Sequence, residues 1–461
     1  MAYNRKQRLN DNIKAIETAF ILDREQRTPT ARERLLLERY CGFGGLKCIL
    51  NPARELADAV HWAKSDLELF APTVELHRLI RENSKNESEY KQLMDSLKQS
   101  VLTAFYTSSA VTEALTDVLK EHQIIPEKVL EPSAGIGAFV DSVLDNNPKA
   151  DIMAFEKDLL TGKILRHLHP EQKVRIEGFE TIEKPFNDYF DLAISNIPFG
   201  DVAVFDPSYT AMKGMRALVT RRIHNYFFVK ALDTVRDGGL VAFITSQGVL
   251  NAKNNSAARF MMLYHADLVS AIRLPNNLFT ENANREVGSD LIILQKNSQK
   301  ESLRGDDNLL DTVYNDENRI PTNNYFLEHP ERIIHTTAKL DTDPFGKPAM
   351  IYTHEDGVEG IAEDLRKMLH EDFKKNLNLN RYLGIEETKA EEVKEVEETE
   401  KIEKTEKMKP SIEEKQNDTV VSLQKQEKPT DDAELSQKSN HQQPPVQMTL
   451  FDLWGMEEEN R

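Results

Sequence analysis

Four consecutive residues, Asn196-Ile197-Pro198-Phe199, have the types and order from which we expect chemistry. They follow the apolar run at 190–194, which is typical of a buried parallel strand that delivers a loop to the carboxyl edge of a sheet. The Asn offers a neutral amide oxygen, the Pro stiffens the turn and the Phe presents a flat apolar face. Together they suit a planar substrate that carries an amine, such as a nucleobase.

A second group of residues predicts a ligand with an adenosyl part. Glu131, Gly135 and Gly137 follow a short apolar run and open a helix, where glycines let a ligand approach the backbone near the helix N-terminus. Val140 replaces the third small residue of a dinucleotide fingerprint, which disfavours a nicotinamide or flavin. Glu156, nineteen residues beyond Gly137, can accept both hydroxyls of a ribose. An adenosyl ligand beside an amine-binding loop indicates methyl transfer from S-adenosylmethionine.

The elements that position these residues are predicted by alternating apolar runs and amphipathic stretches. Strands are expected at 129–130, 152–155, 190–194, 240–245, 269–274 and 290–295. Helices are expected at 138–146, 158–168, 226–235 and 256–264. This alternation predicts an α/β fold with a mostly parallel sheet and helices on both faces.

The flanking regions differ from this pattern. The N-terminal region looks helical, with a second helix starting near Thr30 and a glycine-rich turn at 41–45 that packs Phe43. A Glu/Lys/Thr/Gln-rich tail cannot bury enough apolar surface to order itself. We therefore divide the chain into a helical region 1–100, a main domain 101–296, a small accessory region 297–385 that is a candidate for DNA recognition, a disordered linker 386–445 and a terminal peptide 446–456.

Composition limits the partners and the compartment. The net charge is -18, and residues 386–461 hold 21 Asp/Glu against 11 Lys/Arg, so the rest of the chain is only mildly acidic. This balance argues against indiscriminate coating of nucleic acid but allows a local basic groove. Cys41 and Cys48 are too few for a disulfide framework or a thiolate metal cluster. With no signal peptide or long apolar stretch in view, we expect a soluble cytoplasmic protein.

The residues named so far resemble the adenine-specific (amino) DNA methyltransferases of the γ motif order. The likeness is in particular to the methylase domains of methylase and helicase fusion proteins of bacterial mobile elements and phages, and it covers roughly 100–296, with a looser likeness at 40–47. It implies a Rossmann-like S-adenosylmethionine-dependent methyltransferase that acts on the exocyclic amine of adenine in DNA, with no metal and no covalent intermediate. The family loop reads Asn or Asp, Pro, Pro, then Tyr or Phe, so Ile197 departs from it. Its carbonyl survives, and we expect altered loop stiffness rather than lost chemistry.

The resemblance also implies roles for individual residues. In the catalytic loop, the Asn196 side chain and the Ile197 carbonyl would accept hydrogen bonds from the target amine, with Pro198 between them and Phe199, which would stack on the extruded base. Residues 105–107 would touch the methionine part of the cofactor. The cofactor-binding set is Phe105, Tyr106, Thr107, Glu131, Pro132, Gly135, Gly137, Glu156, Phe179 and Asn196.

Basic residues lie between the catalytic loop and the next predicted helix, in an otherwise acidic chain. Such a loop suits phosphate contacts that set register on DNA, and an ordinary solvated loop is the open alternative. The candidates are Lys213, Arg216, Arg221 and Arg222. His224 and Asp290 are expected to be structural.

The C-terminal residues Gln447, Leu450 and Phe451 resemble the peptide with which bacterial replication proteins bind the sliding clamp. A short apolar anchor on a long tether raises local concentration without a rigid interface. A helix that docks on the protein's own core is the alternative.

Two other function classes stay open. RNA and protein-glutamine methyltransferases share an Asn-Pro-Pro-Tyr loop on the same fold, although the segment 105–107 favours DNA. The chain could instead be a catalytically silent DNA-binding or anti-restriction protein, with Ile197 as a sign of decay. We see no nuclease signature or Walker A motif, so a restriction or helicase partner would be a separate chain. The recognition site is not predicted.

Overall fold

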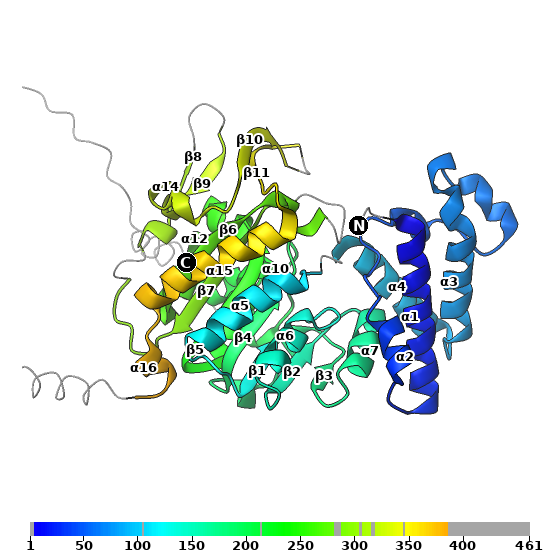
Figure 1. The fold of residues 1–461 in the computed structure, drawn as a ribbon, viewed down its shortest axis with the longest axis horizontal. Coiled ribbons are helices and arrows are strands. Elements are labelled where there is room, and N and C mark those ends of the chain that lie inside the picture. Colours follow the sequence, from blue (N-terminus) through cyan, green and yellow to red (C-terminus); the bar gives the residue numbers. More distant parts are fainter. Residues whose placement is uncertain are drawn as a thin grey trace, which may run out of the picture. The chain divides into compact units, whose positions relative to one another are not determined.

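The computed structural model describes residues 4–103, 106–212, 214–280, 287–303, 307–314, 319–343 and 346–385. Within these ranges the central element is a seven-stranded sheet in the order β3-β2-β1-β4-β5-β7-β6 (Figure 1). Its strands are β1 (Lys128–Glu131), β2 (Asp151–Phe155), β3 (Lys173–Arg175), β4 (Phe190–Asn196), β5 (Val235–Ser246), β6 (Ala266–Leu274) and β7 (Ser289–Lys296). Only β7 runs antiparallel to its neighbours β5 and β6. The predicted α/β, Rossmann-like fold with a mostly parallel sheet is confirmed.

The central strands are largely apolar, as expected for a sheet that is covered on both faces. Alternate residues enter different cores: Leu192 and Ile194 of β4 join one cluster of buried side chains, and Ala193 between them joins the other. This alternation follows from the two-residue period of a strand. A strand buried on both sides reads as a continuous apolar run, which is why these strands could be recognised in the sequence.

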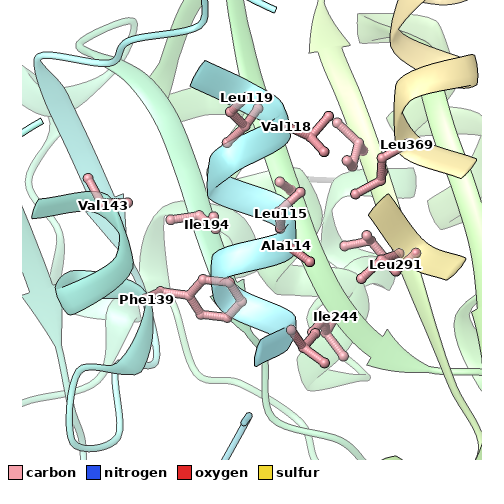
Figure 2. Packing of buried hydrophobic residues seen from close by; sticks show 14 of the residues in the cluster. Ala114, Leu115, Val118, Leu119, Phe139, Val143, Ile194, Ile244, Leu291 and Leu369 are labelled. Atoms are coloured by element: carbon pink, nitrogen blue, oxygen red, sulfur yellow. The ribbon is translucent and has the colours of Figure 1, made fainter. Parts of the chain in front are cut away.

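Helices cover both faces of the sheet. Figure 2 shows Leu115 of α5 (Ser109–Glu121) among buried side chains of one cluster, with Ile194 and Phe139 on one side of the helix and Leu369 on the other. Phe139 belongs to α6 (Ala138–Asn146) and Leu369 to α15 (Gly357–Asn376). The opposite face is covered by α10 (Ile223–Thr234) and α12 (Ser256–His265).

The N-terminal helices pack against α7 (Leu159–Leu168), which follows β2. They are α1 (Arg5–Glu25), α2 (Ala31–Leu37), α3 (Phe70–Glu82) and α4 (Glu87–Thr103), with short 3-10 turns η1 (Lys47–Leu50), η2 (Leu56–His61) and η3 (Lys64–Leu69). Thr30 caps α2 through a capping box, as expected from the sequence. Phe43 is fully buried beside Tyr40, so the glycine-rich turn is structural. Polar contacts also reach α7 and its cap: Arg34 Nη1 donates to the Leu168 carbonyl oxygen at 2.6 Å.

The remaining described elements are short. They are α8 (Pro207–Thr210), α9 (Met215–Val219), α11 (Gly248–Asn251), α14 (Asn324–Glu328), α16 (Leu379–Tyr382), the turns η4 (Phe179–Thr181), η5 (Lys184–Phe186), η6 (Lys253–Asn255), η7 (Asn276–Phe279), η8 (Asp307–Leu309) and η9 (Pro330–Arg332), and the paired strands β8 (Thr312–Tyr314) with β9 (Pro321–Asn323) and β10 (Thr337–Thr342) with β11 (Pro348–Thr353). The accessory region 297–385 therefore contributes α15 to the sheet's own core. Its role and boundaries, like those of the other regions, remain predictions.

Most predicted strands and helices lie within a few residues of the observed bounds, whereas β3, α5, α8 and α9 were not predicted. Several predictions lie outside the described residues: Phe105, Lys213, the linker 386–445 and the terminal peptide 446–456 with Gln447, Leu450 and Phe451. In the described part of the chain, no helix has the length and apolar character needed to cross a bilayer.

Candidate functional site

The two predicted loops begin at the point where the strand order reverses. β1 and β4 are neighbours, but the chain leaves β1 toward β2 and β3 on one side and leaves β4 toward β5 on the other. Open α/β sheets hold ligands in the crevice outside the carboxyl ends of the strands at such a point. Glu131 is the last residue of β1 and Asn196 is the last residue of β4, so both loops start at this crevice.

The loop after β1 is tightly enclosed. Gly135 and Gly137 have φ of 57° and 97°, a region that L side chains rarely adopt. A Cβ on Gly135 would lie 2.9 Å from a ring carbon of Tyr106, and one on Gly137 would lie 2.4 Å from Nε2 of His169. The loop therefore needs glycine at both positions for space as well as for backbone conformation.

Two acidic residues lie beside this loop. Glu156 follows β2 and accepts hydrogen bonds from the Gly135 N–H at 2.8 Å and from the Asp158 N–H at 2.7 Å. Burial, with the nearby Asp158 charge, raises the pKa of Glu156 to about 8. Glu131 is buried, and this burial raises the pKa of its carboxyl well above the usual range. Its Oε2 atom has no hydrogen-bond partner among the described residues.

The loop after β4 continues the strand pairing by one residue. Asn196 lies opposite Ile244 of β5, and the Ile197 N–H donates to the Ile244 carbonyl oxygen at 3.0 Å. The Ile197 side chain is only 1% exposed. A proline at this position could not donate that bond. Phe199 is half-buried, with its ring edge-on to Phe279 at a centroid distance of 6.4 Å.

A direct contact joins the two loops. The Ser195 hydroxyl donates to the Ser133 carbonyl oxygen at 3.3 Å. Pro132, next to Ser133, is buried, and Pro198 is half-buried. The structure thus brings the glycine loop, Glu156 and the Asn196 loop to one edge of the sheet.

The segment before α5 reaches the same edge from another direction. Tyr106 is half-buried and Thr107 is buried. The hydroxyl oxygens of Tyr106 and Tyr40 lie 3.4 and 3.2 Å from Thr161 Oγ1. Burial raises the pKa of Tyr106 well above its usual range. Sequence reasoning missed Tyr40 and Thr161, because only the fold brings the N-terminal turn to α7.

Phe179 lies in the core rather than on the surface of the crevice. It is 1% exposed and sits in an aromatic group with Phe155 and Phe227, at centroid distances of 5.8 and 5.3 Å. Its position behind the Glu156 loop allows it to support this edge from within.

The predicted basic residues divide into two kinds. Arg216 makes a bidentate pair with Asp233, with N–O distances of 2.6 and 2.9 Å. Arg222 pairs with Asp201 at 2.8 Å, which ties the catalytic loop's C-terminal side to the start of α10. Arg221 is exposed. Of the described candidates, Arg221 is therefore the one whose side chain faces solvent.

The two residues expected to be structural are both buried. His224 Nε2 lies 3.5 Å from Asn255 Nδ2, and burial with the Arg222 charge lowers the pKa of His224 to about 4. Asp290 accepts from Arg273 Nε at 2.9 Å, and both side chains are inaccessible to solvent or nearly so.

The model of one protein family, described as N-6 DNA methylase, matches residues 88–391, which is more than half of the chain. The chain belongs to the N-6 DNA methylase family. This membership supports the predicted resemblance to adenine N6 methyltransferases and implies the use of S-adenosylmethionine.

Individual relatives of the chain are distant. It is 28% identical over 201 residues to defense against restriction protein B of Escherichia phage P1, a match that covers 42% of this chain and 8% of that protein. Among solved structures it is similar to a type I restriction-modification methyltransferase subunit from Streptococcus thermophilus (12% identity, 81% of this chain and 94% of that one, TM-score 0.36). It is also similar to an ATP-dependent type ISP restriction-modification enzyme bound to DNA (13% identity, 80% and 28%, TM-score 0.38). At these TM-scores the likeness carries no argument about function.

The residues at this crevice fit S-adenosylmethionine. A buried carboxylate oxygen of Glu131 lacks a partner, and the glycine loop admits no side chain between Tyr106 and the backbone of Gly135. Glu156 is placed at the end of β2, where a ribose hydroxyl pair is bound in related α/β sheets. Among the described residues, no cluster of three or more His, Cys, Asp or Glu side chains could hold a metal ion.

Proposed function

We propose that this N-6 DNA methylase transfers a methyl group from S-adenosylmethionine to the exocyclic amine of adenine in DNA. The observation that carries the proposal is the junction of two loops at one crevice, through the Ser195 to Ser133 hydrogen bond. One loop has the features of a nucleoside site and the other offers amide and carbonyl acceptors. A methyl donor and an amine are thereby held on adjacent strands.

On the cofactor side, Glu156 would accept hydrogen bonds from the ribose hydroxyls, and the loop at Gly135 and Gly137 would hold the nucleoside part of the cofactor. The raised pKa of Glu156 means that the free protein holds this carboxyl largely protonated at neutral pH. Hydroxyl donors favour the ionised form, so ligand binding releases a proton. Tyr106 and the buried Glu131 close the site on the methionine side. The bound cofactor supplies an electrophilic methyl group.

On the substrate side, the chain's own groups position the base. The Asn196 amide oxygen and the Ile197 carbonyl oxygen accept hydrogen bonds from the two N–H groups of the adenine amine. These bonds direct the lone pair of the amine nitrogen toward the methyl donor. Extruding a base costs a few kcal/mol, and stacking on an aromatic ring such as Phe199 returns about 1–3 kcal/mol. Positioning and fixed dipoles then supply most of the rate enhancement, without a covalent intermediate.

The proposal extends to the γ order of the sequence motifs and to a setting in mobile elements. The segment at 105–107, the glycine loop and the Asn196 loop follow one another along the chain, which supports the γ order. A phage protein of which this chain matches only 8% supports a setting among large mobile-element proteins. We keep the sliding clamp as a proposed partner for Gln447, Leu450 and Phe451, and phosphate contact as the proposed role of Arg221.

The competing functions are methylation of RNA or protein glutamine and silent DNA binding. The phage relative's name, defense against restriction, raises the last of these. Intact Glu131, Glu156 and Asn196 at one crevice favour an active enzyme over a decayed one.

The test is transfer of labelled methyl from S-adenosylmethionine to mixed-sequence DNA, RNA and cell protein, with Asn196→Ala alongside. We expect label in DNA as N6-methyladenine, lost in the variant, and sequencing of the product then gives the methylated site. Label in RNA or protein alone would replace DNA as the substrate. Cofactor binding without transfer to any of the three would favour the silent DNA-binding protein.

A further inference from the structure

The stretch that follows the catalytic loop exposes large apolar side chains. Val202 is 59% exposed, Phe205 77%, Met212 45% and Leu218 39%, and the stretch begins three residues after Phe199. We call residues 202–218, without the undescribed residue 213, the apolar segment. Single exposed apolar residues are ordinary on a protein surface, but several together next to a binding site mark an interaction surface.

The backbone on either side of Phe205 is firmly held. The Val204 N–H donates to the Thr220 carbonyl oxygen at 2.8 Å. Asp206 is buried and accepts from the Tyr226 hydroxyl at 2.7 Å and from Lys230 Nζ at 3.1 Å. Phe205 is therefore presented to solvent between two anchored neighbours.

Buried polar contacts also hold the rest of the apolar segment in place. Tyr209 is 2% exposed, and its hydroxyl bonds to Asp233, which also takes the bidentate pair from Arg216. An exposed aromatic ring on a fixed backbone adds nothing to folding, because it stays in water. It lowers the ordering cost of binding a partner.

The charges around the apolar segment identify the kind of partner. Arg221 is exposed directly after Thr220, and Lys253 is exposed next to Asn254, which accepts from Arg222. The nearby Asp201 is neutralised by its pair with Arg222. Exposed cations beside apolar groups suit a polymer with phosphates outside and stacked flat rings inside.

We propose that the apolar segment docks on duplex DNA beside the target adenine and that Phe205 inserts into the base stack. The proposal rests on the proposed function and extends it to how the base leaves the duplex. Apolar wedges such as Phe partly unstack a base step and so lower the cost of extrusion. Because Phe205 is already held outward, little further ordering is needed when DNA binds.

The experiment uses the full chain and an unmethylated duplex oligonucleotide. The duplex contains the target sequence that sequencing of the methylated product identifies. The variants are Phe205→Ala, Phe205→Trp and, as a matched control, Leu35→Ala, since Leu35 is 60% exposed on α2 far along the chain. We expect Phe205→Ala to lower kcat/KM on the matched duplex about tenfold, since stacking energies convert to that factor. Phe205→Trp and Leu35→Ala should stay within about twofold of wild type.

A second duplex with an abasic position opposite the target adenine separates a wedge from a general contact. Extrusion is already easy there, so Phe205→Ala should lose less than about threefold. An unchanged rate on the matched duplex, or an equal loss on both duplexes, would overturn the wedge. If wild-type protein methylates no DNA, the proposed function itself fails, and that result appears before any variant is made. Titration calorimetry should show unchanged S-adenosylmethionine affinity for Phe205→Ala.

Discussion

The two sides of the crevice are built in opposite ways. On the cofactor side, Glu156 accepts a hydrogen bond from the Gly135 N–H, and neighbouring rings leave no room for a side chain at either loop glycine. The N-terminal region closes this side through Tyr40, in the turn after α2, whose hydroxyl contacts Thr161 of α7. On the substrate side, the chain leaves Asn196 half-buried and then exposes large apolar side chains such as Phe205.

This difference matches two kinds of ligand. A small ligand of fixed shape is best met by a closed, preformed site whose polar groups are already aligned. A long polymer needs a surface that is fixed from beneath and open above. The arginine pairs Arg216 with Asp233 and Arg222 with Asp201 supply that fixing on the substrate side. The comparison predicts that mutations on each side change different measurable quantities.

The largest effect is expected at the acceptor of the substrate amine. Asn196→Ala should lower kcat by about 10²–10³-fold, because it removes a positioned dipole that acts on the reacting group. Although Asn196 is also in the predicted cofactor-binding set, affinity for S-adenosylmethionine should change by less than about threefold, since the glycine loop and Glu156 are untouched. Labelled methyl transfer and titration calorimetry measure the two quantities. Asn187→Ala, at an exposed asparagine after η5, is the control and should change neither.

A large loss of cofactor affinity in Asn196→Ala would break the comparison. The two sides would then be one coupled site, held through Ser195 and Ser133.

The next effect concerns the acid on the cofactor side. Because the pKa of Glu156 is raised to about 8 and ligand hydroxyls favour the ionised carboxylate, cofactor affinity should rise with pH up to about 8. Below that value, each further drop of one pH unit should lower the affinity for the cofactor by up to about tenfold. The Glu156→Gln variant should bind S-adenosylmethionine about 10–100-fold more weakly than wild type at pH 8.5 or so. Its affinity should also depend less on pH.

Calorimetry at several pH values between about 6 and 9 tests this prediction, with the range set by the usual titration width around the pKa. Glu171→Gln, at an exposed acid, should keep the wild-type profile. A pH-independent wild-type affinity would show that Glu156 is not the group that binds the ribose.

The cofactor side could largely be predicted from the sequence, whereas on the substrate side only the Asn196 loop could. Gly135, Gly137 and Glu156 follow apolar strands at spacings that the parallel sheet imposes, so their meeting could be predicted. Buried strands and long amphipathic helices leave strong periodic signals. The family loop at Asn196 could be placed for the same reason.

What the sequence did not predict depends on long-range packing. Tyr40 meets Thr161 across 121 residues of chain, and no local pattern encodes that contact. Arg216 reads as a DNA contact in the sequence, because its partner Asp233 becomes visible only when α9 lies beside α10. The short helices α8 and α9 lack the length that makes periodicity legible, which hid the presentation of Phe205.

The arginines sharpen the comparison within the substrate side itself. Arg221→Ala should weaken DNA binding a few-fold and reduce the slope of log affinity against log salt by about one, because one phosphate contact is lost. Arg216→Ala should leave that slope unchanged and lower the free energy of unfolding by about 1–3 kcal/mol, since Asp233 is left without its bidentate partner. Salt-dependent binding and urea unfolding separate the two outcomes. A salt-slope change in Arg216→Ala would return that residue to the DNA surface.

The smallest effect on catalysis is expected at Ile197, whose backbone extends the pairing of β4 with β5. Ile197→Pro should lower the free energy of unfolding by about 1–3 kcal/mol, because it removes the N–H bond to Ile244 and shrinks a buried side chain. The rate should stay within about threefold, since the carbonyl at this position and the Asn196 amide remain. Ile197→Val keeps the N–H and should cost about 0.5–1.5 kcal/mol, which separates the lost bond from the lost volume. If Ile197→Pro instead lost its rate at unchanged stability, the strand extension would hold the acceptors in position rather than stabilise the fold, and the departure from the family loop would belong to the chemistry.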